Sequence, residues 1–140
     1  MSLPNVNITL GNGNIGAVTL SDDGIAGLIL TGTAVSSTLE LNKVYVIAST
    51  SDLKKLGLTA ENNPLAYKEV LGFYESAGDG AELHLLVVDA AKTLTEICSM
   101  EDGSPLKTLI DSAAGRIRLV GINRNPEDAY EPTVTSGIDQ

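Results

Sequence analysis

The pattern of apolar and polar positions is clearest in the stretch that begins at Asn63. Asn63 is a residue type that caps helix starts, and Pro64 fits the first helical turn. An apolar stripe at helical spacing follows: Ala66, Val70, Phe73, Tyr74 and Ala77. Gly78 can adopt the left-handed conformation that ends a helix. The sequence therefore predicts a helix over 64–77 that buries this stripe, Phe73 included.

Three runs have the composition of β-strands. Glu82–Val88 is mostly apolar, which suits a strand covered on both faces. Val44–Ala48 and Arg116–Ile122 are the two other runs, and segments with helical patterns separate the three. Successive strand–helix–strand units form parallel strands through right-handed crossovers. We therefore expect the three strands to lie parallel in one sheet.

Three shorter helices are expected between these strands. Ser51 or Asp52 can cap a helix that runs through Leu56. Residues 90–100 are predicted to be helical in part, and Ser104 before Pro105 predicts a helix that covers Leu106–Ala114.

The N-terminal third has a different pattern. Ile15–Leu20 and Ile25–Leu30 are apolar runs, and the turn residues Ser21–Gly24 separate them. This arrangement predicts a β-hairpin, attached to the sheet as an antiparallel element. Residues 1–14 are rich in Asn and Gly and predict a flexible arm, whereas residues 123–140 are polar and predict a linker or tail.

The fold class that these elements indicate is α/β. We expect a small mixed sheet with two βαβ crossovers and an N-terminal β-hairpin or arm, with residues 15–122 forming a single domain. A chain of 140 residues is long enough to bury a sizeable core.

Composition excludes several classes of function. The chain has 18 acidic and 9 basic side chains and a formal net charge of −9, which disfavours binding to nucleic acid or to an anionic membrane surface. Cys98 is the only cysteine, so no internal disulfide can form. The first residues lack the pattern of a secretory signal peptide, and no apolar run is long enough to span a bilayer. We therefore expect a soluble, cytosolic product.

Gly11–Gly16 fits the G-x-G-x-x-G pattern of dinucleotide-binding loops. That motif needs a helix directly after the glycines, so that the helix N-terminus faces the pyrophosphate. Ala17–Leu20 instead leads into a turn, so we interpret the glycines as a flexible or bulged entry to a hairpin. No cofactor is expected.

The ends of the three expected parallel strands are the place to look for an active site, because open parallel sheets bind ligands there. Polar residues at these ends are Ser49, Thr50, Asp52, Asp89, Asn123 and Arg124. His84 lies inside the central strand, away from this rim, and we expect it to be structural. One His and one Cys cannot form a usual zinc site, and Cys98 is expected to be inert packing. The sequence thus predicts neither an enzyme nor a metal site.

Four short motifs resemble those of the contractile tail sheath proteins of phages and related injection machines. They are Asp52–Gly57, Asn63–Tyr67, the pair Phe73-Tyr74, and Gly78–Gly80 before the strand. In that family a short helix precedes a longer helix that ends in two aromatics, and a Gly-rich corner leads into an apolar strand.

Two N-terminal segments extend this resemblance. Leu3–Val6 and Asp23–Leu28 are similar to the N-terminal part of a sheath-like group found in gut bacteria. Ala77–Gly80 departs from the family's usual Asn-Gly-Gly corner, and the Arg often found late in the following strand is absent. Sheath subunits are substantially longer than this chain, so we expect an N-terminal portion or fragment.

The resemblance implies a structural subunit, with copies of itself, tail tube proteins and baseplate proteins as partners. Such a protein would be found in the bacterial cytoplasm during assembly and then in the virion tail. Val6, Ile8 and Leu10 alternate and could line one face of a strand that joins a neighbouring subunit, which makes them the hypothetical interface residues. The alternative from the residues alone is a small ligand-binding or enzymatic α/β domain that uses the strand-end rim.

Overall fold

The computed structural model describes residues 25–132, 134–136 and 138–139. Four strands form one sheet in the order β2-β3-β1-β4, and a separate two-stranded hairpin pairs β5 with β6. The elements are β1 (Ala26–Thr31), β2 (Val44–Ile47), α1 (Thr50–Lys55), α2 (Pro64–Ala77), β3 (Leu83–Val88), α3 (Leu94–Cys98), α4 (Pro105–Ser112), β4 (Leu119–Asn123), β5 (Val134–Thr135) and β6 (Ile138–Asp139).

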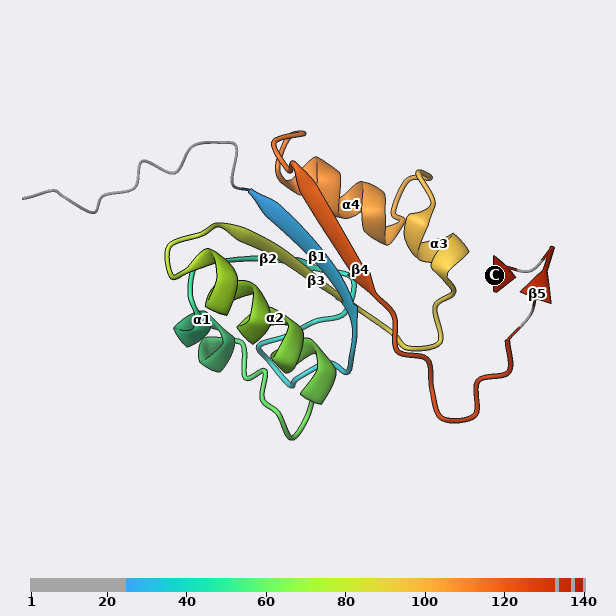
Figure 1. Ribbon diagram of the computed structural model, residues 1–140, viewed down its shortest axis with the longest axis horizontal. Coiled ribbons are helices and arrows are strands. Elements are labelled where there is room, and N and C mark those ends of the chain that lie inside the picture. Colours follow the sequence, from blue (N-terminus) through green and yellow to red (C-terminus); the bar gives the residue numbers. More distant parts are fainter. Residues whose placement is uncertain (1–24, 133, 137, 140) are drawn as a thin grey trace, which may run out of the picture.

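The sheet lies between two pairs of helices (Figure 1). Alternate residues of the strands face α1 and α2, and this larger core contains Leu30, Leu53, Val70 and Leu85. The other residues face α3 and α4, where Ile29, Leu86, Ile97 and Leu109 form the second core. The mixed α/β class expected from the sequence is therefore correct.

β1 and β3 are the centre of the sheet, and they run parallel to each other. Each position of β3 is buried, and so is each position of β1 except Leu28. β4 pairs with the other side of β1, also in parallel. Because β1 has a parallel neighbour on both sides, it has no free edge for a hairpin partner. The expected hairpin between Ile15–Leu20 and Ile25–Leu30 is therefore wrong, and residues 15–20 themselves lie outside the described part of the chain.

β2 is an edge strand that runs antiparallel to β3, with Val44 opposite Leu86 and Ile47 opposite Leu83. The expectation that the strand at Val44–Ala48 is parallel to the one at Glu82–Val88 is therefore wrong. The first crossover joins the parallel strands β1 and β3. β2, α1 and α2 all belong to the long connection between these two strands. The second crossover, from β3 through α3 and α4 to β4, places β4 beyond β1.

The buried stripe of α2 is narrower than the sequence predicts. Ala66, Val70 and Tyr74 are buried, but Phe73 is only half-buried and Ala77 is exposed. Consecutive helix residues point about 100° apart, so Phe73 and Tyr74 cannot both face the sheet. Tyr74 takes the core position and donates a hydrogen bond to the Ala81 carbonyl at 3.3 Å. Phe73 packs edge-on against it, with ring centroids 5.1 Å apart.

The segment after β4 was expected to be a polar linker or tail. Asn123 ends β4, and the following chain returns along the end of β1 before the small hairpin of β5 and β6. No helix in the described ranges is long and apolar enough to cross a membrane.

The central strand β3 supplies the first test. Leu85 is completely buried between β1, β2 and α2. We expect Leu85→Ala to lower the free energy of unfolding by about 2–5 kcal/mol, because it removes buried methyl groups and leaves a cavity. Met100→Ala, at an exposed site, is the matched control and should change it by less than about 0.5 kcal/mol. Equal effects in urea unfolding would contradict the assignment of the core.

Candidate functional site

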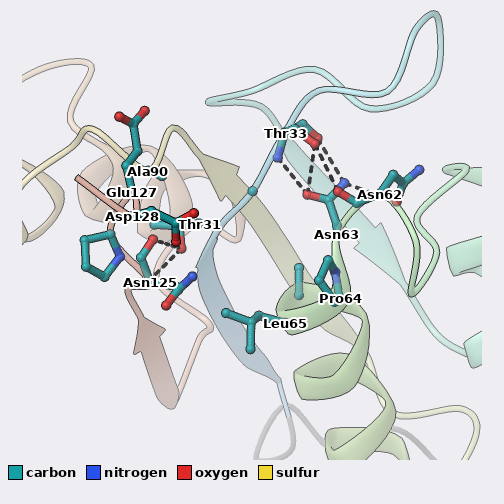
Figure 2. A pocket seen from close by; sticks show the side chains of 13 residues that line it. Thr31, Thr33, Asn62, Asn63, Pro64, Leu65, Ala90, Asn125, Glu127 and Asp128 are labelled. Atoms are coloured by element: carbon teal, nitrogen blue, oxygen red, sulfur yellow. Dashed lines mark hydrogen bonds between the residues drawn. The ribbon is translucent and has the colours of Figure 1, made fainter. Parts of the chain in front are cut away.

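A hollow of about 380 Å³ lies where β1 ends and α2 begins. Figure 2 shows that its wall combines the loop after β1, the start of α2 and the segment that follows β4. The residues that line it are Thr31, Gly32, Thr33, Asn62, Asn63, Pro64, Leu65, Ala66, Ala90, Asn125, Pro126, Glu127 and Asp128. This is the carboxyl end of the parallel strands, the region where open α/β sheets bind ligands.

Asn63 forms one wall of the hollow and is 3% exposed. Its Oδ1 accepts a hydrogen bond from the Thr33 backbone N–H at 2.7 Å, and its Nδ2 donates to the Thr33 carbonyl at 3.1 Å (Figure 2). The sequence predicted a helix cap here, but the Asn63 side chain makes no capping hydrogen bond. It instead ties the start of α2 to the loop after β1. A side chain at Gly32 would overlap Asn63 Oδ1, so that position requires glycine.

Thr31 holds the opposite wall. Its Oγ1 donates to the Asn125 carbonyl at 3.1 Å and accepts from the Asn125 backbone N–H at 2.8 Å. The chain after β4 is thereby fixed against the end of β1, which brings Glu127 and Asp128 to the rim of the hollow. Among the lining residues, these two carboxylates are the ionisable groups. The side chains of Thr31 and Asn63 already form hydrogen bonds with backbone groups of the protein. The described lining thus contains two carboxylates, with no His, Lys, Arg or Cys side chain beside them.

The rim residues predicted from the sequence are divided between the two ends of the sheet. Because β2 is antiparallel to β3, the chain leaves β2 beside the start of β3, while Asp89 follows the end of β3. Ser49, Thr50 and Asp52 are therefore at the end of the sheet opposite to Asp89. None of the predicted rim residues lines the hollow.

Asp52 acts as a local brace. Its Oδ2 accepts hydrogen bonds from the Ala48 backbone N–H at 3.1 Å and from Ser49 Oγ at 3.2 Å. Its Oδ1 lies 2.6 Å from Lys55 Nζ. The hydrogen bond from Lys55, followed by that from Ala48, lowers the pKa of this carboxyl group to about 2. These contacts join the end of β2 to α1.

The other end of the sheet carries Asp89, Asn123 and Arg124. Asp89 Oδ1 accepts from the Ala91 N–H at 2.8 Å and closes a turn. Arg124 Nε donates to the Lys92 carbonyl at 2.7 Å, and its guanidinium lies over the Tyr130 ring at 4.2 Å. These contacts connect the turn after β3 with the chain after β4, and Asn123 is exposed at the end of β4.

His84 is 2% exposed and has two polar partners. Its Nδ1 lies 3.0 Å from Ser112 Oγ, and its Nε2 lies 2.9 Å from Glu82 Oε1. This order resembles a serine–histidine–acid relay. However, the Ser112 hydroxyl already donates to the Leu109 carbonyl at 2.6 Å inside α4, so its single proton is not directed at His84. The cluster joins α4 to β3, and none of its three residues lines the hollow.

Sequence reasoning missed the partners of His84. Ser112 lies 28 positions further along the chain, and nothing local indicates that it meets the histidine. Glu82 lies two positions before His84, and residues i and i+2 share one face of a strand. This spacing was the signal in the sequence that Glu82 could contact the histidine.

Two other predicted features can be placed. Cys98 is exposed, so its expected role as inert packing is wrong; Ile97 is the buried residue of α3. The described residues hold no group of three or more His, Cys, Asp or Glu side chains that could bind a metal ion. Gly11–Gly16 and the interface residues Val6, Ile8 and Leu10 lie outside the described ranges.

Comparison with protein-family models gives a match. The family model described as "DUF2586, N-terminal domain" matches residues 3–127, which is most of the chain. The chain therefore belongs to this family. No curated protein and no solved structure matches it.

The Asp52 brace predicts a pH dependence. Its carboxyl has a lower pKa in the folded protein than in the unfolded chain, where it is about 3.9. The brace therefore stabilises the fold fully above about pH 4, and this contribution is lost as the pH falls towards 2. In urea unfolding between pH 5 and pH 3, Asp52→Asn should lose less stability than the unsubstituted protein.

Glu75→Gln on the exposed face of α2 is the matched control and should behave like the unsubstituted protein. Lys55 is 76% exposed, so added salt should weaken its part of the effect while the Ala48 hydrogen bond persists. An Asp52→Asn profile that matches that of the unsubstituted protein would contradict the brace.

Proposed function

We propose that this chain, a member of the DUF2586 family through its N-terminal domain, is a structural subunit, or a portion of one, of a contractile tail sheath. The proposal starts from the sequence motifs around α1, α2 and β3, which resemble those of sheath proteins. The observation that carries it concerns the two edge strands of the sheet, β2 and β4. Both are uncharged and expose an apolar side chain, as surfaces that accept another strand do.

Both edge strands have one strand neighbour within the described part of the chain. β2 has the sequence VYVI and β4 has the sequence LVGIN, so neither contains a charge or a proline. Val46 on β2 is 59% exposed, and Leu119 on β4 is 69% exposed. Proteins normally protect such edges with lysine, proline or a bulge, because an apolar edge is a template for another strand. These two edges suit the addition of a strand from outside.

The incoming strand in this proposal is the N-terminal arm of a neighbouring copy, with Val6, Ile8 and Leu10 on its apolar face. Backbone hydrogen bonds along the edge would give the affinity, and the alternate side chains would set the register. Subunits linked in this way can slide during contraction while the links hold. The partners would be copies of this chain, tail tube proteins and baseplate proteins, in the bacterial cytoplasm during assembly and then in the virion tail.

The alternative is a small ligand-binding or enzymatic α/β domain. The hollow at the end of β1 favours it, because the hollow lies at the strand ends where such domains bind ligands. Its polar side chains bond mainly to backbone groups of other lining residues, as Asn63 does to Thr33, which favours a structural role for the hollow.

The alternative has a direct test through Gly11–Gly16. If these glycines bound a dinucleotide, NAD or FAD would raise the melting temperature by mass action. We expect no change at millimolar concentrations of either nucleotide. A reproducible rise that Gly13→Val abolishes would favour the ligand-binding domain over the sheath subunit.

The arm provides the test of the main proposal. Ile8→Lys places a charge on the apolar face of the proposed strand and should weaken self-association of the chain in sedimentation equilibrium. Asn7→Lys is the matched control, because it adds the same charge on the opposite face and should leave association nearly unchanged. In dilute monomer, amides of residues 2–14 should exchange hydrogen quickly, while those of Leu83–Val88 stay protected.

Two results would count against arm exchange. One is slow exchange throughout Val6–Leu10 in a proven monomer, which would mean that the segment pairs within its own domain. The other is an equal loss of association in Ile8→Lys and Asn7→Lys, which would indicate a general effect of charge.

A further inference from the structure

The apolar run Ile15–Leu20 cannot pair with β1, because both edges of β1 already have a strand partner. β1 pairs with β3 from Ala26 to Thr31 and with β4 from Ala26 to Leu30. Both edges of β1 are therefore occupied along nearly its whole length. The run contains Ile15, Val18 and Leu20 and no charged residue, so leaving it in water would expose considerable apolar surface.

The start of β1 lies directly beside the start of β4. The Arg118 N–H donates to the Ile25 carbonyl at 3.0 Å, and Ala26 is the partner of Leu119 in the register. Figure 1 shows β1 and β4 side by side, with their first residues at the same end of the sheet. The chain before Ile25 is thus already next to the first residue of β4.

The outer edge of β4 can accept a strand. Val120 and Ile122 pack towards α3 and α4, whereas Leu119, on the other face, is 69% exposed. β4 has β1 as its strand neighbour in the described ranges and no charged side chain. An apolar edge of this kind pairs readily with a segment held close to it.

We propose that Ile15–Leu20 of the same chain adds to the outer edge of β4 as an antiparallel strand. Ser21–Gly24 would connect it to β1 across the first residue of β4. Four residues span up to about 13 Å when extended. The strand position beyond β4 is two strand spacings from β1, or about 10 Å. The connector is therefore long enough, and its turn-forming residues suit the reversal.

The direction of this strand follows from the connection. A segment that enters β1 at its first residue through a short turn must run opposite to β1, and therefore opposite to β4. Leu20 would lie near Leu119, and Ile15 would lie towards Asn123. This pairing narrows the proposed sheath function, because it occupies one of the two sheet edges that the proposal uses. It would leave β2 as the sheet edge that remains open to another molecule.

Disulfide cross-linking tests this pairing. In a Cys98→Ser background, Leu119→Cys is combined in turn with Val18→Cys, Thr19→Cys or Leu20→Cys, which covers the possible registers. Facing strand residues lie within the range of Cα distances that a disulfide spans. At least one pair should form an intramolecular bond under mild oxidation, detected in purified monomer as a mass decrease of two hydrogens.

The matched control replaces Leu119→Cys with Val46→Cys, which is also exposed but lies on the opposite edge strand. These pairs should remain reduced. Equal cross-linking to both edges, or none to Leu119→Cys, would overturn the proposal. Bonds that form exclusively between molecules would also overturn it, because the strand on β4 would then come from a second copy.

Hydrogen exchange on the unsubstituted monomer gives a second measurement that needs no cysteines. Amides of residues 15–20 should exchange slowly and those of residues 2–14 quickly. Fast exchange in residues 15–20 would overturn the pairing and leave the sheath proposal untouched, whereas slow exchange in residues 6–10 would count against the arm alone.

Discussion

The parallel pairing of β1 with β3 is the constraint on which the rest of this domain depends. These two strands are apolar on both faces, so each must be covered by helices above and below. Two cores follow from that requirement, one against α1 and α2 and one against α3 and α4. The shorter strands, β2 and β4, can then lie only at the edges. The exposed apolar positions of the sheet, Val46 and Leu119, are a result of this order.

Elements with a strong local signal could be predicted from the sequence. The helix at Pro64–Ala77 and the strand at Leu83–Val88 are found within a residue of the expected bounds, because spacing, a starting proline and an ending glycine all agree. The pairing of strands could not be predicted in the same way. Ser21–Gly24 has the composition of a hairpin turn, but β1 pairs with strands that lie far away in the sequence. The apolar character of Ile25–Leu30 on both faces was the signal for a central strand.

The candidate site shows the same division between local and distant information. The sequence predicts a helix cap at Asn63, but the side chain bonds to Thr33, 30 residues away, so its role as a cross-link could not be inferred. The polar strand ends were correctly identified as strand ends, yet the antiparallel β2 separates Asp52 from Asp89. One reversed strand is enough to divide a rim that looks continuous in the sequence. The hollow at Thr31 and Asn125 arises from the path of the chain after β4, for which the sequence has no periodic signal.

The parallel arrangement of β1 and β4 has a mechanical consequence. The chain enters β1 at one end of the sheet and leaves β4 at the opposite end. A tension applied between Ala26 and Asn123 would therefore act along the strands and shear them past each other. In that direction the hydrogen bonds between β1 and β4 share the load and must break together, whereas a hairpin would open one bond at a time. A pull in this direction therefore loads these hydrogen bonds together and does not break them in turn.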